Sequence, residues 1–332
     1  EIKSILPMIR AEASDRIIYD YLLFNRTDIT EDTFFKRIKK LSHGSLINIC
    51  EDTININKWY TLSQSVSKCK ELSPEDYRDL FRDSLKLRLR ADVPVGVSLS
   101  GGIDSSAIVS SLIKDFGLSE LNTLSAVYGK EEPADESEFI DEFKPMVKNM
   151  HYTSPNADSF YNDHEDFIDA HNEPVTDIGP YIQYKVMELA SNHVTVTLDG
   201  QGADEQLAGY HYFFGSYYLE LLKKYKLTKF IGENIQYLKK HNSTTAIKYL
   251  VYYLLPTSAQ KRVNSQIFPS INNHFLQTNS EFSSVNKYLL KPKSLNESLL
   301  QHFEYKLEHL LRWEDLNAMH FSIESRVPFL DY

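Results

Sequence analysis

Two adjacent glycines among hydroxyl residues mark the first stretch that could do chemistry, SLSGGIDSS at residues 98–106. Glycine readily takes positive φ, so Gly101 and Gly102 can turn several backbone N–H groups toward one anion. Ser100, Ser105 and Ser106 add hydroxyl donors. Asp104 would repel a bare phosphate, but a Mg²⁺ ion bound between them would offset both negative charges. The stretch lacks the lysine and the spacing of a Walker A loop, and it predicts a phosphate-binding loop of another kind.

Two further stretches carry acidic and basic side chains. TLDGQGADEQLAGY at residues 197–210 again places glycines and carboxylates after an apolar run, and SIESRVPFLDY at residues 322–332 pairs Glu324 with Arg326. Loops at the carboxyl ends of neighbouring parallel strands open on one crevice, so Asp104 and Asp204 could share one Mg²⁺ if their strands are close. Each stretch also has a structural interpretation, namely an incidental turn, an acidic helix cap and an ion pair near a helix end. Spacing alone does not decide whether Glu324 and Arg326 of the third stretch have a functional or a structural role.

Alternating strands and helices must position these loops. Apolar runs predict strands over 95–99, 123–128 and 194–198, while helical periodicity predicts helices over 104–114, 138–150, 157–170 and 181–191. Ser73 is expected to cap a further helix that begins at Pro74. From Tyr210 onward the pattern is mostly helical, most clearly over 298–321. This order predicts an α/β fold, a parallel twisted sheet with helices on both faces, followed by a mainly helical region.

Residues 1–60 predict a separate region. Apolar spacing predicts helices over 15–24 and 31–41, and alternation of apolar and polar residues predicts strands over 45–49 and 53–60. Residues 61–72 are polar and unpatterned, and they are expected to form a linker. The chain begins without Met and stops at PFLDY, so we expect a piece of a longer protein.

Composition excludes several classes of protein. A net charge of −10 makes non-specific nucleic-acid binding a poor interpretation, because such binding needs a basic face. The two cysteines, Cys50 and Cys69, form no C-x-x-C pair and are expected to be buried or half-buried free thiols. The longest apolar run, at residues 249–255, is far shorter than the ~20 residues of a membrane span. We expect a cytoplasmic protein without nucleic-acid or membrane partners.

In this order the three motifs resemble those of a known family. LSGGIDSS is similar to the S-G-G-x-D-S pyrophosphate loop of the N-type ATP pyrophosphatases, and LDGQGADE…GY with ESRVPFLD resembles the synthetase domain of glutamine-dependent asparagine synthetases. Residues 1–60 resemble the closing segment of the class II, Ntn-type glutaminase domain that precedes it. The resemblance implies an adenine nucleotide α-hydrolase-like synthetase domain over residues 73–332, truncated at its C-terminus.

The resemblance also implies an activity and a set of site residues. ATP·Mg²⁺ would adenylate a carboxylate, foremost the aspartate side chain, with release of pyrophosphate, and ammonia from glutamine would then displace AMP to give asparagine. Asp104 and Asp204 would hold the metal, Gln201, Glu324 and Arg326 would be catalytic, and Thr176 and Asp177 would contact the acceptor. The nucleotide would be bound by Leu99, Ser100, Gly101, Gly102, Asp104, Ser105, Ser106, Val127, Asp199 and Gly200.

Departures from the family pattern leave the acceptor open. Asp199 and Gln201 replace the serine and the glutamate of the usual S-G-E-G-S-D-E loop, and that glutamate is linked to formation of the acyl-adenylate. No arginine occurs in NEPVTDIGPYIQY at residues 172–184, where members of the family hold aspartate. One alternative is a related amide synthetase, cyclase or biosynthetic-cluster amidotransferase acting on another carboxylate. The other is a non-catalytic nucleotide-binding paralogue, against which the intact Asp104 and Asp204 argue.

Two functional parts of the family are missing from the sequence. Class II glutaminases use an N-terminal cysteine, and Glu1 is not that residue. The family also uses a lysine beyond PFLD, where this chain has ended. We expect that the chain as given could not hydrolyse glutamine, that the glutaminase domain is a partner absent from it, and that a homodimer is possible.

Overall fold

The computed structural model describes residues 1–51, 53–69, 71–129, 132, 135–267 and 270–331. The chain divides into two compact units, each built from two separated segments. Unit 1 comprises Glu1–Cys69 and Asp204–His309, and unit 2 comprises Lys70–Ala203 and Leu310–Tyr332. The predicted domain boundaries, with a linker at 61–72, stay a prediction, although the short helix α3 (Leu62–Val66) lies within that stretch.

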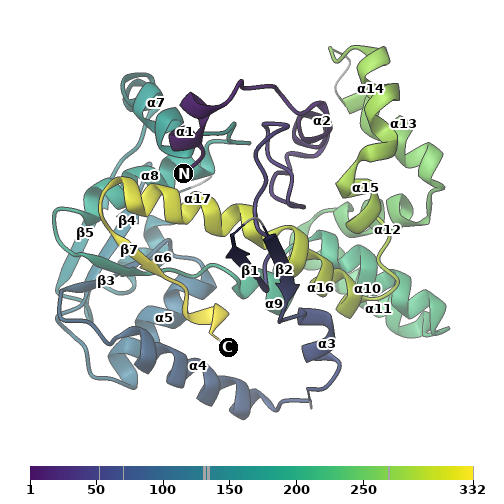
Figure 1. Ribbon diagram of the computed structural model, residues 1–332. Coiled ribbons are helices and arrows are strands. Elements are labelled where there is room, and N and C mark those ends of the chain that lie inside the picture. The colour runs from purple at the N-terminus through teal and green to yellow at the C-terminus, as the bar shows by residue number, and fades with distance from the viewer. Residues whose placement is uncertain (52, 70, 130–131, 133–134, 268–269, 332) are drawn as a thin grey trace. The chain divides into compact units, whose positions relative to one another are not determined.

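A five-stranded parallel sheet forms the centre of unit 2 (Figure 1). Its strands, in the order β5-β4-β3-β6-β7, are β5 (Asn149–Thr153), β4 (Asn122–Ala126), β3 (Val95–Ser98), β6 (Val196–Leu198) and β7 (Glu324–Arg326). The sheet confirms the predicted α/β class, including the three predicted strands. Strands β5 and β7 were not predicted.

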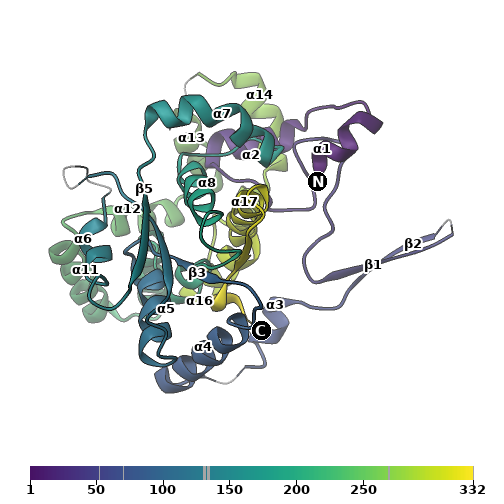
Figure 2. The same ribbon diagram turned by 90° about the vertical axis from the view of Figure 1, so that its left-hand side faces the viewer.

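Helices cover both faces of this sheet, as predicted (Figure 2). The helices of unit 2 are α4 (Pro74–Arg88), α5 (Ile103–Lys114), α6 (Ser137–Asp141), α7 (Ala157–His171), α8 (Gly179–Ala190) and most of α17 (Leu307–His320), and the short 3-10 helix η3 spans Pro328–Leu330. On one face Leu85 of α4 and Ile108 of α5 join a core with Val97. On the other face Met187 of α8 and Ala318 of α17 pack with Leu124.

The order of the strands reverses between β3 and β6. From β3 the chain continues to β4 on one side, whereas β6 is followed by β7 on the other, and β3 and β6 lie side by side with Val95 opposite Val196. In open parallel sheets such a switch point leaves a crevice at the carboxyl ends of the two strands. The two glycine-containing stretches of the sequence begin there, so the condition that their strands are close is met.

Unit 1 is mainly helical, which confirms the prediction for the region after Tyr210. Its helices and strands are α1 (Ile2–Ile5), η1 (Leu6–Met8), α2 (Asp15–Phe24), β1 (Ser45–Cys50), β2 (Thr53–Lys58), α3, the greater part of α9 (Ala203–Leu207), α10 (Tyr212–Lys223), α11 (Leu227–His241), α12 (Thr245–Leu254), α13 (Thr257–Ile267), α14 (Asn273–Asn279), η2 (Ser280–Phe282), α15 (Ser284–Tyr288) and α16 (Leu295–Tyr305). One core joins α10, α11 and α12. A second joins α2 to α14 through Tyr19, Leu23 and Leu276. The first residues of the chain therefore pack with helices more than 200 positions later.

Strands β1 and β2 form an antiparallel hairpin, as the alternation predicted (Figure 2). The pairing places Ile47 opposite Ile56 and Ile49 opposite Ile54. Cys50 ends β1 and Cys69 follows α3, and both are exposed free thiols. The prediction that they are buried or half-buried was wrong, because neither the strand that Cys50 ends nor the helix that precedes Cys69 contributes a buried side chain.

The structure corrects three predicted helices. Residues 31–41 form turns and isolated bridges. Thr33 Oγ1 donates to the carbonyl of Ile38 at 2.8 Å, and Thr and Asp side chains of this kind compete with helix formation. The helix expected over 138–150 is only α6, and the chain then enters β5, since Pro145 cannot continue a helix. The segment 298–321 is two helices, α16 and α17, which meet at Lys306.

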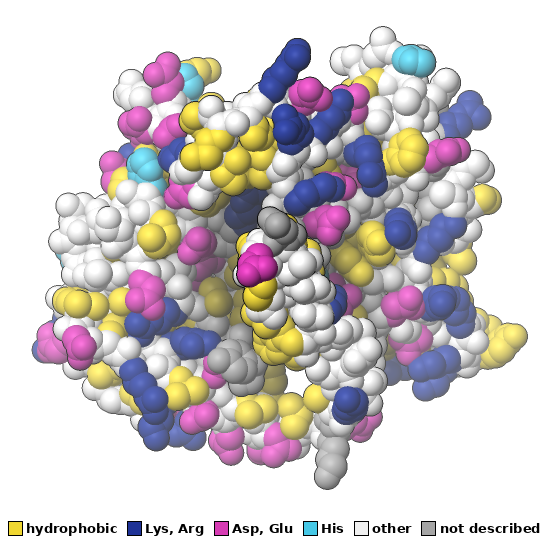
Figure 3. Space-filling model, viewed as in Figure 1, with side chains coloured by type: hydrophobic (Ala, Val, Ile, Leu, Met, Phe, Trp, Pro, Cys, Tyr) yellow, Lys and Arg dark blue, Asp and Glu magenta, His cyan; other side chains and the backbone are white. Residues whose placement is uncertain are grey.

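The last features of the fold concern surface charge and the hydropathy of the helices. On the face shown in Figure 3, basic and acidic side chains are interspersed. Among the described residues, no helix is both long enough and apolar enough to cross a membrane.

Candidate functional site

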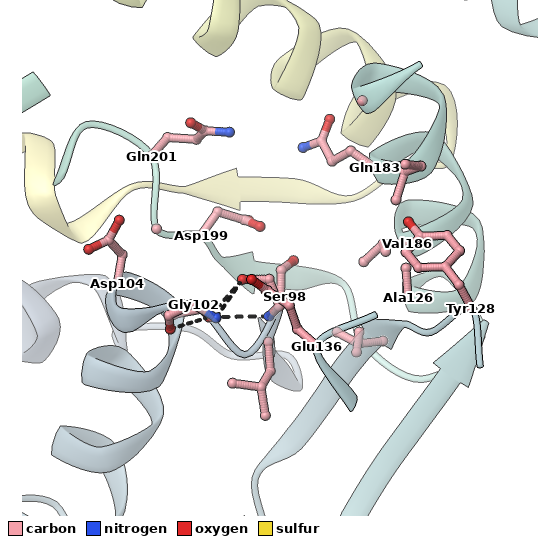
Figure 4. Close-up of a pocket in the computed structure, with 17 residues that line it drawn as sticks. Ser98, Gly102, Asp104, Ala126, Tyr128, Glu136, Gln183, Val186, Asp199 and Gln201 are labelled. Carbon is pink, nitrogen blue, oxygen red and sulfur yellow. Dashed lines mark hydrogen bonds between the residues drawn. The ribbon is translucent and has the colours of Figure 1, made fainter. Parts of the chain in front are cut away.

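A cavity of about 400 Å³ opens at the carboxyl ends of β3, β4 and β6 in unit 2 (Figure 4). This volume suits a small-molecule ligand. The predicted residues that line it are Leu99, Ser100, Gly102, Asp104, Ser105, Asp199, Gly200 and Gln201. The tertiary structure therefore brings the first two motifs to one pocket.

Hydrogen bonds among the serines shape the loop between β3 and α5. The Ser105 hydroxyl oxygen accepts from the backbone N–H of Ser100 at 3.1 Å, and the Ser100 hydroxyl oxygen accepts from the N–H of Gly102 at 3.2 Å. The two hydroxyl oxygens lie 3.1 Å apart. The loop thus folds around its own serines (Figure 4). Among the described side chains none caps the start of α5, so the positive end of this helix is available to an anion.

Gly101 meets two constraints that exclude other residues. Its φ is +89°, and a Cβ at this position would lie 2.9 Å from the carbonyl oxygen of Glu136. Gly200 of the second loop is also close to its neighbours, since a Cβ there would lie 3.2 Å from the Cβ of Asp104. Gly200 therefore lets the second loop approach Asp104 closely, and Gly101 lets the first loop approach the backbone at Glu136.

Asp199, which belongs to the second loop, forms the floor of the pocket. It is buried, and its Oδ2 accepts hydrogen bonds from Thr197 Oγ1 at 2.8 Å and from Ser325 Oγ at 3.0 Å. Its backbone N–H donates to the carbonyl of Arg326 on β7. Burial raises the pKa of Asp199. The residue therefore links the pocket to the last strand of the sheet.

The rest of the pocket lining comes from residues that were not predicted as site residues. They are Ser98, Leu124, Ala126, Tyr128, Glu136, Gly179, Ile182, Gln183 and Val186. Gln183 accepts a hydrogen bond on Oε1 from Asn317 of α17 at 2.6 Å, and its amide faces that of Gln201 across the pocket (Figure 4). Only the position of Gln183 on a helix could be predicted, because its orientation depends on a helix distant in sequence.

The charges of the pocket fit a metal–polyphosphate ligand. Among the described residues that line it there is no lysine, arginine or histidine, while Asp104, Glu136 and Asp199 are acidic. Burial raises the pKa of Glu136. A polyphosphate would need a cation beside Asp104, and oxygen ligands of this kind suit Mg²⁺. The backbone N–H groups of the loop and the start of α5 would supply the remaining donors.

Three predicted nucleotide-binding residues lie beside the pocket without lining it. Gly101 belongs to the loop and Ser106 to the first turn of α5, and Ser106 Oγ lies 3.5 Å from the carbonyl oxygen of Gly101. Val127 packs against the core on one face of the sheet, while its neighbours Ala126 and Tyr128 line the pocket. Successive side chains of an extended chain point to opposite sides, which explains this division.

The predicted acceptor residues lie just before α8. Asp177 is exposed, and its Oδ1 accepts from the backbone N–H of Gly179 at 2.8 Å. Gly179 itself lines the pocket. Thr176 and Asp177 are therefore next to the pocket in sequence, and their contact with an acceptor stays a prediction.

Glu324 and Arg326 form an ion pair with 2.7 Å between Oε1 and Nε. They lie on β7. Arg326 also donates to the carbonyls of Arg88 and Arg90 at 2.5 and 3.0 Å. Neither residue is among those that line the pocket. These contacts join β7 to the end of α4, and the catalytic role stays a prediction.

The predicted metal pair is divided between the two units. Asp104 lines the pocket of unit 2, whereas Asp204 belongs to unit 1 and its pKa is raised by burial and by the charge of Glu205. Within the described part of the chain, no three His, Cys, Asp or Glu side chains form a cluster that could hold a metal by themselves. Joint metal binding by Asp104 and Asp204 stays a prediction.

The parallel sheet, its switch point and the glycine–serine loop at the pocket define an α/β protein with a candidate ligand site at the carboxyl ends of its strands. Residues 76–332 match the family model described as asparagine synthase, so the chain belongs to the asparagine synthase family. This match confirms the resemblance of the three motifs.

Individual relatives are similar at low identity. The chain is 24% identical to asparagine synthetase (glutamine-hydrolyzing) 3 of Bacillus subtilis, over 100% of this chain and 53% of that protein. It is 34% identical to a protein of Methanocaldococcus jannaschii provisionally named asparagine synthetase (glutamine-hydrolyzing) 2, over 53% of this chain and 34% of that protein. It is 27% identical to the amidase chry2 of Gibberella zeae, over 57% of this chain and 31% of that protein. The chain thus spans about half or less of these relatives.

Proposed function

We propose that this chain carries the carboxylate-activating part of an ATP-dependent amidotransferase. A carboxylate oxygen of the acceptor attacks the α-phosphorus of ATP, the bond to the bridging oxygen breaks, and pyrophosphate leaves with its electron pair. Ammonia then attacks the acyl carbon of the acyl-adenylate, AMP leaves, and a proton is released as the amide forms. In the whole protein the ammonia would come from glutamine.

One observation carries this proposal. The Ser100–Ser105 loop and the Asp199–Gln201 loop line the same cavity at the switch point of the sheet, in a chain of the asparagine synthase family. A carboxylate is a poor acyl donor until its oxygen becomes part of a good leaving group, and adenylation supplies that group. Both partners of the first step are anions, so donors and a metal must neutralise the developing charge.

Each part of the site has a proposed role in this chemistry. The backbone of Ser100–Gly102 and the start of α5 would hold the released pyrophosphate. Asp104 would hold Mg²⁺, together with Asp204, and the metal when bound would offset the charge of the phosphates. Tyr128 and Val186, which also line the pocket, would contact the nucleoside.

Aspartate is the first candidate for the acceptor because of the family. A second candidate, another carboxylate, is favoured by the walls of the pocket. The α-carboxylate of free aspartate calls for a cation, and the described residues of the lining offer the amides of Gln183 and Gln201 instead. An acceptor without an α-carboxylate would fit a lining that offers amide groups and no cation among the described residues.

The test is ATP–pyrophosphate exchange by the full-length protein across a panel of carboxylates. Exchange measures the first step alone and needs no ammonia. Exchange with aspartate only would establish the asparagine synthetase activity, and exchange with another acid would establish the second candidate. Asp104→Asn should reduce exchange strongly without changing the circular dichroism spectrum. Tight ATP binding without exchange for any acid would contradict the proposal and support a non-catalytic paralogue.

A further inference from the structure

A buried carboxyl group lies behind the pocket and has no role in the proposed function. Glu314 is on α17 and is 2% exposed, and Asp199 of the pocket floor is 5% exposed. Ser325 of β7 joins them, because its Oγ lies 3.0 Å from Asp199 Oδ2 and is also hydrogen-bonded to Glu314 Oε1. Two buried carboxyl groups thus share one hydroxyl group.

Counting protons assigns the donors in this cluster. A hydroxyl carries one proton, so Ser325 cannot donate to both carboxyl groups. Thr197 also donates to Asp199 Oδ2, at 2.8 Å, and an oxygen with two donors is best stabilised as a carboxylate. If Ser325 donates to Asp199, the Ser325 oxygen must accept from Glu314, which then carries a proton. The donors run from Glu314 to Ser325 to Asp199, and the pair of carboxyl groups holds one proton.

The charges around Glu314 favour the protonated form. The charged groups of the described residues that act on it are Asp199, from the loop after β6, and Asp315, on α17 itself. Both are acidic. Burial raises the pKa of Glu314 well above its usual range, and the charge of Asp199 adds to this shift.

The arginines on the elements packed around Glu314 have other partners. On β7, Arg326 pairs with Glu324 and donates to two backbone carbonyls. On α17, Arg312 pairs with Glu173. The α8 side chains that line the pocket are those of Ile182, Gln183 and Val186, and all three are neutral. A second carboxylate beside Asp199 would therefore be a buried charge with no cation to offset it.

We propose that Glu314 is a positioning residue of the nucleotide pocket, which retains a proton and, through Ser325, keeps Asp199 as the single, oriented carboxylate of the floor. The identification of this pocket as a nucleotide site rests on the proposed function. Loss of the proton would add a negative charge behind a site for polyphosphate, and like charges in a buried setting repel strongly. Nucleotide affinity should therefore fall as the pH rises through the titration of Glu314.

The experiment compares ATP affinity across pH in the full-length protein and in three variants. In the wild type, the Kd for ATP with Mg²⁺ should rise by roughly tenfold as Glu314 titrates, which corresponds to about 1.4 kcal/mol. Glu314→Gln keeps a neutral donor for Ser325, so its affinity should stay near the best wild-type value at every pH. Glu314→Ala removes the donor and should weaken binding at every pH. Glu308→Gln, on the same helix but in unit 1, is the matched control and should keep the wild-type profile.

Two results of this binding experiment would overturn the inference. The first is a Glu314→Gln variant with the pH profile of the wild type. The second is a Glu314→Gln variant that melts like the wild type but has lost affinity at every pH, which would mean that a carboxylate is needed. Thermal unfolding of each variant separates these results from misfolding.

Infrared spectroscopy separates failure of this inference from failure of the proposed function. A protonated buried carboxyl group has its own C=O stretch, which should be present in the wild type above the usual titration range of carboxyl groups and absent from Glu314→Gln. If that band is present but no nucleotide binds, the proposed function has failed and the proton on Glu314 stands. If ATP binds but the band is absent, the inference has failed.

Discussion

Gly101 shows how a single residue determines the shape of the loop between β3 and α5, the predicted phosphate-binding loop. Its φ of +89° lies in the left-handed region, and the carbonyl of Glu136 occupies the space that a side chain would need. Strain of this kind costs about 1–2 kcal/mol for a residue with a Cβ. The resulting turn allows the serine hydroxyls and the N–H of Gly102 to meet.

Gly101→Ala should therefore weaken nucleotide binding by at least about tenfold, since the loop would have to move from its bonded geometry. Isothermal calorimetry with ATP and Mg²⁺ measures this change. Gly117→Ala is the matched control, because Gly117 also has a positive φ, +68°, but nothing lies within 4 Å of its added Cβ. It should lose stability without losing affinity. Equal affinity losses in both variants would contradict the role given to Gly101.

At the scale of elements, Asp20 of α2 caps the start of α15. Its carboxylate accepts from Ser283 Oγ and from the backbone N–H groups of Ser284 and Val285, at 2.8 and 3.4 Å for the two N–H groups. Burial raises the pKa of Asp20 to about 6. These bonds join two helices of unit 1 that are more than 250 residues apart.

Removal of this cap should destabilise unit 1. Asp20→Ala leaves buried donors without a partner, which costs about 1–3 kcal/mol each in comparable cases. Asp20→Asn keeps one acceptor and should cost less. Asp15→Ala removes an exposed carboxylate from the same helix and should cost under about 1 kcal/mol. Urea unfolding at neutral pH measures all three, and equal costs for positions 15 and 20 would refute the capping role.

At the scale of the whole molecule, Lys306 couples the free energy of unfolding to pH. It is 6% exposed, and its Nζ lies 2.9 Å from the Tyr212 hydroxyl, 3.4 Å from Glu205 Oε1 and 3.3 Å from the centre of the Tyr210 ring. Burial lowers the pKa of Lys306 to about 8, against the partly compensating charge of Glu205. Between about pH 8 and 10.5 the unfolded chain binds a proton that the folded chain does not.

The free energy of unfolding should therefore rise with pH in this window, by up to about 1.4 kcal/mol per pH unit from this group. Lys306→Met should remove that slope, whereas Lys224→Met, at an exposed lysine of α10's C-terminal end, should keep it. The comparison uses urea midpoints of the three proteins at several pH values. A difference between the wild type and Lys306→Met that is constant across pH would show that Lys306 keeps its proton in the folded protein.

Local physics explains which elements could be predicted. The capping box at Ser73 and Asp76 starts α4 as its sequence indicates, because a cap depends only on neighbours in the chain. Helix α2 spans the predicted residues because the spacing of its apolar side chains is likewise a property of neighbouring residues. The segment 31–41 is not the predicted helix, since its apolar spacing suits a helix while Thr33 and the bridges to Ala13 and Lys39 hold it in turns.

The sequence by itself was enough to identify the family of this protein and to predict the chemistry of its site. The order of its motifs identified the family, and the types and spacing of Ser100, Gly101, Gly102 and Asp104 predicted a phosphate-binding loop, because backbone freedom, hydroxyl donors and charge are properties of neighbouring residues. Only the tertiary structure decided what faces that loop. Gln183 and Glu314 reach the pocket or its floor through strand order and helix packing, which depend on contacts between residues far apart in the chain.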